Sequence, residues 1–196
     1  MKQHVVEGKS TLRREILSRL KRLSESDRLT GSRSAVALLL RQPVWTAAKS
    51  ILLYAPVGNE LDIWPALAAA LDAGKTVSLP RFSSTIGQYV ACRVKDPTID
   101  LLQGHYGIRE PAEHCETVAL NRLDFALVPG VAFDLHGRRL GRGKGYYDRL
   151  LAGMRGKTCG VAFDEQIVRE VPVQPHDSDV NCILTPTRLN SPKLGL

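Results

Sequence analysis

Aromatic residues and long apolar runs are both scarce in this chain of 196 residues. Aromatic side chains make up only 6% of the chain, whereas a module that binds single-stranded nucleic acid interleaves aromatic side chains with exposed cations. No apolar run approaches the roughly eighteen residues that a membrane span needs, and the N-terminus lacks the apolar core of a secretion signal. We therefore expect a cytoplasmic protein that binds neither nucleic acid nor a membrane.

Cysteine is also sparse, and its spacing excludes two further classes of protein. The four cysteines, at positions 92, 115, 159 and 182, form neither a Cys-x-x-Cys pair nor a cluster with histidine. Neither a zinc site nor a disulfide framework is therefore indicated, and we expect reduced thiols. A nucleophile in a Ser/His/Asp or Cys/His context is missing too, so nothing argues for covalent catalysis by the protein.

Positive charge is in excess, with a formal net charge of +7. This excess admits nucleotides, nucleic acid or small polyanions as partners, and the sign of the charge does not choose among them. Residues 9–23 are basic and helical in pattern, which also raises an organelle-targeting peptide. Glu7 and Glu15 argue against that interpretation, because such peptides are poor in acidic residues.

The first forty residues predict two helices. Leu12, Ile16, Leu20 and Leu23 form an apolar stripe in a helix over residues 10–23. A second helix is expected to start at Ser24, with Asp27 completing a capping box, and to end before Pro43. We expect residues 1–196 to form a single domain, in which residues 1–8 are a flexible N-terminal extension.

Beyond Trp45, apolar runs alternate with helical segments, as in a parallel sheet with crossover helices. Buried strands are expected at residues 51–55, 76–79, 125–128, 158–163 and 182–184. A helix over 62–73 would carry Pro65 in its first turn and stop at Gly74. Residues 83–121 are less regular and predict a hairpin around 89–94 followed by a long loop. The expected fold is a three-layer α/β/α protein with an open, mostly parallel sheet.

Polar residues follow several of these strands, where ligands bind in such sheets. The densest group is the segment 138–148, Arg-Arg-Leu-Gly-Arg-Gly-Lys-Gly-Tyr-Tyr-Asp. Its three glycines allow backbone N–H groups to approach a ligand, and its arginines and lysine suit phosphate oxygens. Asp148 could hold a divalent cation that bridges those oxygens. The expected helix over 145–154 would point its N-terminal N–H groups at the same anion.

This segment matches neither familiar phosphate-binding fingerprint. A Walker A loop requires Ser or Thr after its lysine, and here Gly145 follows Lys144. A dinucleotide-binding Gly-x-Gly-x-x-Gly opens directly after a strand, whereas this Gly-x-Gly-x-Gly lies several residues past the expected strand at 125–128. Any phosphate bound here is therefore held in a different geometry.

Four other residues are weaker candidates. Lys9 and Arg13 share one helix face and could reach a phosphate tail, although such charges are more often simply solvated. Glu60 either accepts hydrogen bonds from a ligand or is an acid favoured by the start of a helix, and its spacing supports both equally. His176 precedes Asp177 in a loop, where a surface role is the better interpretation than general-base catalysis.

Together these residues resemble the 5-formyltetrahydrofolate cyclo-ligase family over nearly the whole chain. The resemblance includes Lys-Ser-Thr-Leu-Arg at 9–13, Glu-Leu-Asp at 60–62, Leu-Pro-Arg at 79–81 and Gly-Ile-Arg-Glu-Pro at 107–111. It is densest over residues 124–148 and continues through 160–166 to His176 and Asp177. Members of this family use ATP and magnesium to convert 5-formyltetrahydrofolate to 5,10-methenyltetrahydrofolate. The resemblance also implies a fold of the sugar-isomerase and CoA-transferase type.

The resemblance assigns residues to three ligands. ATP contacts are implied for Lys9, Arg13, Arg139, Leu140, Gly141, Arg142, Gly143, Lys144, Gly145, Tyr146 and Tyr147. Contacts with the folate substrate are implied for Ala55, Glu60, Tyr106, Arg142, Gly143, Lys144, Gly145 and Tyr146. Magnesium would be bound by Asp148 and Asp177, and Arg142 and Lys144 would be catalytic. The expected partners are small molecules, and we expect a monomer.

One position departs from the family pattern. Four residues after Asp177 the family often has a second aspartate, and here Asn181 occupies that place. If this position only orients the loop, asparagine serves equally well, but if it assists the metal, magnesium affinity falls. Two rival functions are a folate- or nucleotide-binding regulator with weak catalysis and a basic nucleic-acid-binding module. Residues 139–148 retain each residue type that the chemistry needs, which disfavours the first rival.

Overall fold

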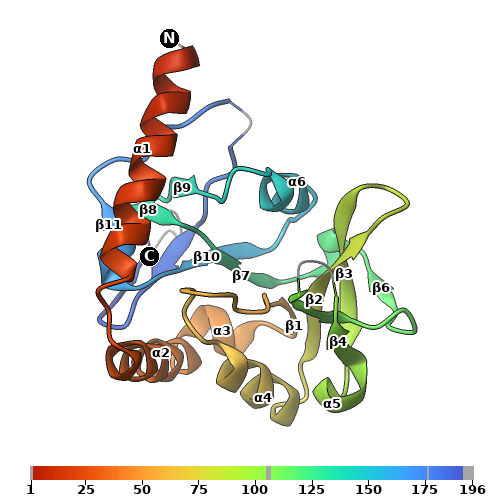
Figure 1. Cartoon of the computed structure of the whole chain (residues 1–196). Helices are drawn as coiled ribbons and strands as arrows, with labels where there is room; N and C mark the ends of the chain where they lie inside the picture. Colours follow the sequence, from red (N-terminus) through yellow and green to blue (C-terminus); the bar gives the residue numbers. More distant parts are fainter. Residues whose placement is uncertain (1, 105–106, 176, 192–196) are drawn as a thin grey trace.

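The computed structural model describes residues 2–104, 107–175 and 177–191. Its centre is an eight-stranded sheet (Figure 1). The strands lie in the order β13 (Leu189–Asn190), β12 (Cys182–Leu184), β10 (Lys157–Val161), β7 (Phe125–Pro129), β1 (Ser50–Leu52), β2 (Thr76–Ser83), β3 (Gln88–Val94) and β6 (Thr117–Val118). The strands from β12 to β2 pair in parallel, while β13, β3 and β6 add antiparallel edges. The predicted open, mostly parallel sheet is confirmed.

Helices cover both faces of this sheet. Figure 1 shows α2, α3 and α4 along one face and α6 on the other. The helices are α1 (Lys2–Leu20), α2 (Glu25–Leu40), α3 (Pro43–Ala47), α4 (Trp64–Asp72), α5 (Pro97–Asp100) and α6 (Tyr146–Ala152). Among the described residues, none of these helices combines the length and the apolar character that a bilayer crossing would require.

The alternation of side chains along β7 explains the three layers. Phe125 and Leu127 belong to the large apolar cluster that includes residues of α2, α3 and α4, whereas Ala126 and Val128 belong to a second cluster with residues of α6. Successive side chains of a strand point to opposite faces, so a continuous apolar run must be covered on both sides. The buried run at 125–128 therefore requires helices on each face.

The helices predicted from the sequence are present in the structure, but their first and last residues differ from the predicted ones. Ser24 caps α2 with Asp27 in the predicted capping box. α1 begins at Lys2 rather than Ser10 and ends at Leu20. Residues 2–8, expected as a flexible extension, are therefore helical and continuous with the rest of α1.

The prediction of a long loop after the hairpin was wrong. The hairpin itself is present as the antiparallel pair β2 and β3. The following segment contains α5, the paired strands β4 (Leu101–Gln103) and β5 (Arg109–Pro111), then β6 and the short 3₁₀ helix η2 (Leu120–Arg122). Strands of two or three residues are too short to show a period-2 pattern, which is why the sequence did not reveal them.

Candidate active site

The glycine-rich segment connects a small sheet to α6 at one end of the main sheet. After β7 the chain forms β8 (Ala132–Asp134) and β9 (Arg139–Leu140), which pair antiparallel, while β11 (Ile167–Val168) pairs with β8 and follows the 3₁₀ helix η3 (Asp164–Gln166). Gly143 and Gly145 have φ angles of 100° and 65°. Side chains other than glycine rarely adopt such angles, so these two positions require glycine. At Gly141 the reason is space, because a Cβ there would lie 3.0 Å from Nη1 of Arg139.

A buried ion pair closes this segment. Nη2 of Arg139 lies 2.5 Å from Oδ1 of Asp148, and Nη1 donates to the carbonyl of Pro129 at 3.4 Å. Only 2% of the Arg139 side chain is exposed. Asp148 also accepts a hydrogen bond from the backbone N–H of Ser178 at 3.3 Å. The pair therefore joins the two ends of the glycine-rich segment and anchors the loop that carries Asp177.

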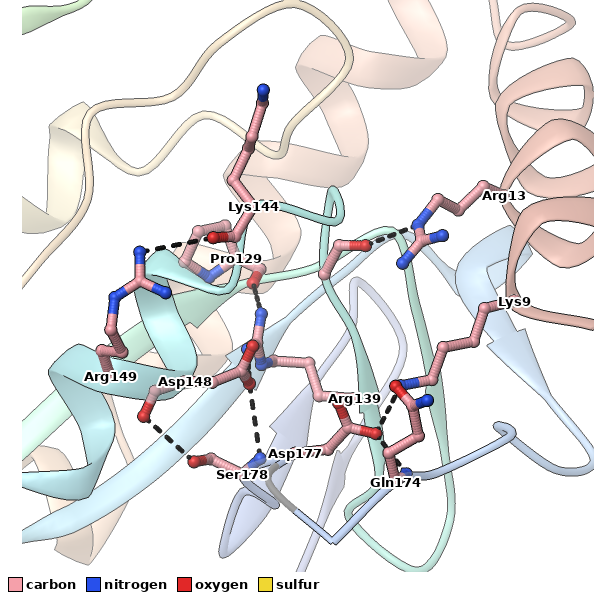
Figure 2. Close-up of polar contacts among 11 residues, drawn as sticks. Lys9, Arg13, Pro129, Arg139, Lys144, Asp148, Arg149, Gln174, Asp177 and Ser178 are labelled. Atoms are coloured by element: carbon pink, nitrogen blue, oxygen red, sulfur yellow. Dashed lines mark hydrogen bonds and ion pairs between the residues drawn. The ribbon is translucent and has the colours of Figure 1, made fainter. Parts of the chain in front are cut away.

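Helix α1 supplies two cations to the same region (Figure 2). Lys9 forms an ion pair with Asp177, with 2.5 Å between Nζ and Oδ2, and donates to Oε1 of Gln174 at 3.2 Å. Nε of Arg13 donates to the carbonyl of Gly141 at 2.9 Å. Both residues thus lie on one helix face, as predicted, and hold α1 against the glycine-rich segment and the Asp177 loop.

These side chains line a cavity of about 640 Å³, here called the charged cavity. Most residues expected to contact ATP line it, as do the two expected metal ligands: Lys9, Arg13, Arg139, Leu140, Gly141, Gly143, Lys144, Gly145, Asp148 and Asp177. Cations, glycines and two carboxylates at one place suit a polyphosphate with its metal ion. The three remaining residues expected to contact ATP are Arg142, Tyr146 and Tyr147.

Those three residues line a second cavity of about 200 Å³, here called the apolar cavity. Its walls include Ala55, Pro80, Tyr89, Ile108, Pro129 and Tyr146. Tyr146 packs edge-on against Tyr89 and Phe82, with ring centroids 5.2 and 5.8 Å away. Arg139, Gly141, Lys144, Gly145 and Asp148 line both cavities, so the glycine-rich segment forms the wall between them.

Glu60 and Arg142 form an ion pair at the rim of the apolar cavity. Nη2 of Arg142 lies 2.8 Å from Oε1 of Glu60, and Oε2 of Glu60 accepts from the backbone N–H of Val57 at 3.0 Å. The Glu60 side chain is 12% exposed and that of Arg142 is 58% exposed. Burial raises the pKa of the Glu60 carboxyl, while Arg142 and the Val57 N–H act in the opposite direction. The position of Glu60 on the cavity wall supports the ligand-binding interpretation over that of a simple helix-start acid.

Lys144 differs from the other cations of the segment. It lines both cavities, yet its ammonium group makes no hydrogen bond or ion pair within the described parts of the chain. Figure 2 shows its side chain directed away from the Arg139 and Asp148 pair. Its carbonyl accepts from Arg149, whose guanidinium lies over the ring of Tyr146 at 5.1 Å. Lys144 thus lines both cavities and carries a positive charge that no other described residue pairs with.

The neighbouring Tyr147 is held as a neutral phenol. Burial raises its pKa well above the ordinary value for tyrosine. The guanidinium of Arg139 lies 5.9 Å from the centre of its ring. Tyr147 therefore contributes packing and a neutral hydroxyl to the apolar cavity rather than a base.

Two further expectations concern single residues. Tyr106 lies outside the described residues. Asn181 accepts hydrogen bonds from the backbone N–H and hydroxyl of Thr158 at 2.8 and 3.1 Å. Its side chain therefore connects the loop before β12 to β10. This contact corresponds to the first of the two alternatives, in which the residue orients the loop.

Sequence reasoning gave no role to several residues of the apolar cavity, including Val57, Tyr89, Ile108 and Glu110. Glu110 is part of the Gly-Ile-Arg-Glu-Pro motif at 107–111, which contributed to the family resemblance. That motif was the signal that could have pointed to the cavity wall. No local pattern shows that β5 reaches the glycine-rich segment, because contacts between distant segments are not encoded in spacing.

Comparisons with known proteins agree on one family. The model of the 5-formyltetrahydrofolate cyclo-ligase family matches residues 5–186. The 5-formyltetrahydrofolate cyclo-ligase of Mus musculus is 30% identical over 188 residues, covering 90% of this chain and 93% of the relative. The enzyme of that name from Escherichia coli strain K12 is 30% identical over 169 residues, covering 84% and 92%.

Solved structures support the same conclusion. The chain resembles the NMR structure of Aquifex aeolicus 5,10-methenyltetrahydrofolate synthetase with a TM-score of 0.86 and 36% identity, covering 96% of this chain and 94% of the other. A Mycoplasma pneumoniae 5,10-methenyltetrahydrofolate synthetase shares the fold, with a TM-score of 0.72, 23% identity and coverage of 91% and 98%.

The raised pKa of Glu60 leads to a prediction about stability. Because the folded protein binds this proton more tightly than the unfolded chain, the contribution of Glu60 to the free energy of unfolding is greatest at low pH and is lost as pH rises through the folded pKa. Glu60→Gln cannot titrate. The stability of wild type relative to Glu60→Gln should therefore fall as pH rises above about 4.5 and through the folded pKa of Glu60, as measured by urea denaturation. Glu113→Gln, the same change at an exposed position, is the control, and a difference that does not vary with pH would contradict the prediction.

Proposed function

Starting from the fact that the chain belongs to the 5-formyltetrahydrofolate cyclo-ligase family, we propose that it uses ATP and magnesium to convert 5-formyltetrahydrofolate into 5,10-methenyltetrahydrofolate, ADP and phosphate. The observation that carries this proposal is the position of Lys144. Lys144 lines both the charged and the apolar cavity, and among the described residues its ammonium group has no hydrogen-bond or ion-pair partner. A reaction that moves a phosphoryl group from a nucleotide to a folate needs a cation where the two ligands meet.

We assign the phosphates of ATP to the charged cavity. Lys9 and Arg13 reach it from α1, and Lys144 reaches it from the glycine-rich segment. Arginine and lysine form charge-assisted hydrogen bonds with phosphate oxygens. The glycines let the backbone come close to the same oxygens.

We assign the pterin of the folate to the apolar cavity. Ala55, Tyr89 and Tyr146 give it a flat, mostly apolar lining, and Glu60 places a carboxylate at its rim. Aromatic walls with a few polar groups are typical of sites for planar heterocycles. The formyl group of the substrate would then face the wall that the two cavities share.

Asp148 and Asp177 fit a magnesium ion that accompanies the nucleotide. Both carboxylates line the charged cavity, and oxygen ligands from one or two carboxylates together with phosphates suit magnesium. Arg139 and Ser178 both contact Oδ1 of Asp148, and among the described residues none donates to its Oδ2. When bound, the ion would neutralise phosphate charge.

The chemistry explains why the site offers charge rather than a nucleophile. A formamide oxygen attacks the terminal phosphorus of ATP, ADP leaves, and the formyl carbon becomes an iminium phosphate. N10 of the folate attacks that carbon, the C–O bond breaks, and phosphate departs with the oxygen. N10 loses its proton, and the product is the cyclic 5,10-methenyl cation. Each step depends on positioning and charge neutralisation.

Arg142 and Lys144 are the cations that we assign to the transferring phosphoryl group. Lys144 lines both cavities and Arg142 lines the apolar one, and both side chains reach solvent in the free protein. Negative charge spreads over the phosphoryl oxygens in the transition state, so donors fixed there lower the barrier. Tyr146, which belongs to the aromatic lining of the apolar cavity, would contact the pterin.

The activity itself is tested with purified protein and 5-formyltetrahydrofolate. We expect the absorbance of 5,10-methenyltetrahydrofolate to rise only when both ATP and magnesium are present. ADP and phosphate should form in a one-to-one ratio with that product. No product under any of these conditions would refute the proposed function.

Removing either proposed catalytic cation should lower turnover without unfolding the protein. Lys144→Ala and Arg142→Ala are each expected to reduce kcat by roughly a hundredfold to a thousandfold, because each removes a charge that faces the transition state. The measurement is initial rate at saturating ATP and folate, with thermal unfolding as a check on folding. Arg155→Ala removes an exposed cation outside both cavities and should leave the rate unchanged. Wild-type turnover in Lys144→Ala would remove Lys144 from the mechanism.

Asp148→Asn tests the metal assignment. The magnesium concentration that gives half-maximal rate should rise by about tenfold or more, because an amide oxygen binds the ion less strongly than a carboxylate. The same variant should unfold at a lower temperature, because the buried guanidinium of Arg139 loses its counter-charge. Magnesium titrations are therefore made well below that temperature. An unchanged titration would exclude Asp148 as a ligand.

A further inference from the structure

Glu110 is a buried carboxylate that the assignments above leave unused. It lies on β5, lines the apolar cavity and is 6% exposed. Its Oε2 accepts a hydrogen bond from the backbone N–H of Phe82 at 3.0 Å. Its Oε1 is buried and has no hydrogen-bond partner within the described part of the chain. Such an oxygen in a native structure requires an explanation.

The other carboxylates of the site each have a cation. Glu60 pairs with Arg142, Asp148 with Arg139 and Asp177 with Lys9. Glu110 forms no ion pair with any cation in the described residues. The nearby Arg81 donates instead to the carbonyl of Ala112. Glu110 is thus the carboxylate on the cavity wall that lacks a counter-charge from the described chain.

The surrounding packing fixes the position of this carboxylate. A Cβ at Gly104 would lie 2.9 to 3.0 Å from Cβ, Cγ and Cδ of Glu110, so the backbone there packs directly against the side chain. The hydrogen bond from Phe82 fixes one oxygen on β2. Because Phe82 also packs against Tyr146, the carboxylate and the aromatic wall form one connected surface. The carboxylate itself is therefore already ordered, and a donor reaches the buried Oε1 by displacing the atoms that cover it.

We propose that Oε1 of Glu110 accepts a hydrogen bond from the 2-amino group of the pterin and thereby selects folates that carry this group. This inference rests on the proposed function. The aminopyrimidine edge of a pterin presents N–H donors, and a carboxylate oxygen without a partner is their complement. In the free protein both oxygens of Glu60 are already engaged, whereas Oε1 of Glu110 is not. Glu110 is therefore a specificity-determining residue, and it takes no part in the transfer of the phosphoryl group.

Glu110→Gln tests this role while conserving shape. The amide oxygen can still accept the hydrogen bond from the Phe82 N–H. The position of Oε1, however, now carries an NH₂ group, which is a donor and cannot accept from the 2-amino group of the pterin. KM for 5-formyltetrahydrofolate should rise roughly tenfold to a hundredfold. Both kcat and KM for ATP should change far less. Glu113→Gln is the matched control, at an exposed position three residues further along.

A substrate analogue separates recognition from a merely structural role. In 2-desamino-2-methyl-5-formyltetrahydrofolate a methyl group replaces the 2-amino group. With wild-type protein, KM should be higher for this analogue than for 5-formyltetrahydrofolate. The factor should be similar to the one by which Glu110→Gln raises KM for 5-formyltetrahydrofolate. Glu110→Gln should discriminate little between the two folates, because the interaction is already lost.

The outcomes distinguish a failure of the proposed function from a failure of this inference alone. Wild-type protein that forms no methenyl product refutes the proposed function and this inference with it. Wild-type turnover combined with an unchanged folate KM in Glu110→Gln overturns the inference alone. If Glu110→Gln does not fold, the comparison in wild type still decides, since equal KM values for the two folates would also overturn the inference.

Discussion

The buried ion pair between Arg139 and Asp148 is the interaction on which the candidate site depends. It joins the two ends of the glycine-rich segment, and each partner is also bonded outward, Arg139 to the end of β7 and Asp148 to the loop of Asp177. A charge as deeply buried as Arg139 needs its partner, because leaving either one alone in the interior is costly. The pair therefore fixes the segment against both the sheet and the following loop.

Because the ion pair fixes it in this position, the glycine-rich segment borders the charged cavity on one side and the apolar cavity on the other. The same five residues border a cavity lined by cations and carboxylates and a cavity lined by aromatic side chains. The proposed transfer of a phosphoryl group to a folate requires both environments, since a polyanion and a planar heterocycle must meet at one atom. Gly141 and Gly145 keep this shared wall thin because they carry no side chain, and Lys144 places a charge in it.

Local signals predicted local structure well, and they failed where distant residues meet. Ser24 and Asp27 defined the start of α2, and the apolar run at 125–128 identified a strand covered on both faces. The glycines and cations of residues 138–148 predict a phosphate site, and most of these residues line the charged cavity. By contrast, the sequence assigned Arg139 to ATP and Asp148 to a metal, and nothing in the spacing showed that the two residues pair with each other. Glu110 was missed for a similar reason, because β5 has only three residues and the hydrogen-bond partner of Glu110, Phe82, lies on β2.

The ion pair between Glu60 and Arg142 has a thermodynamic consequence under the proposed function. Its two members are assigned to different ligands, Glu60 to the folate and Arg142 to the transferring phosphoryl group. Whichever ligand binds first must separate the pair, and the ligand that follows finds its own partner already released. Binding of folate and ATP would then be positively cooperative, and linkage requires that each raise the affinity of the other by the same factor. This single contact at the rim of the apolar cavity would thus favour the ternary complex over either binary one.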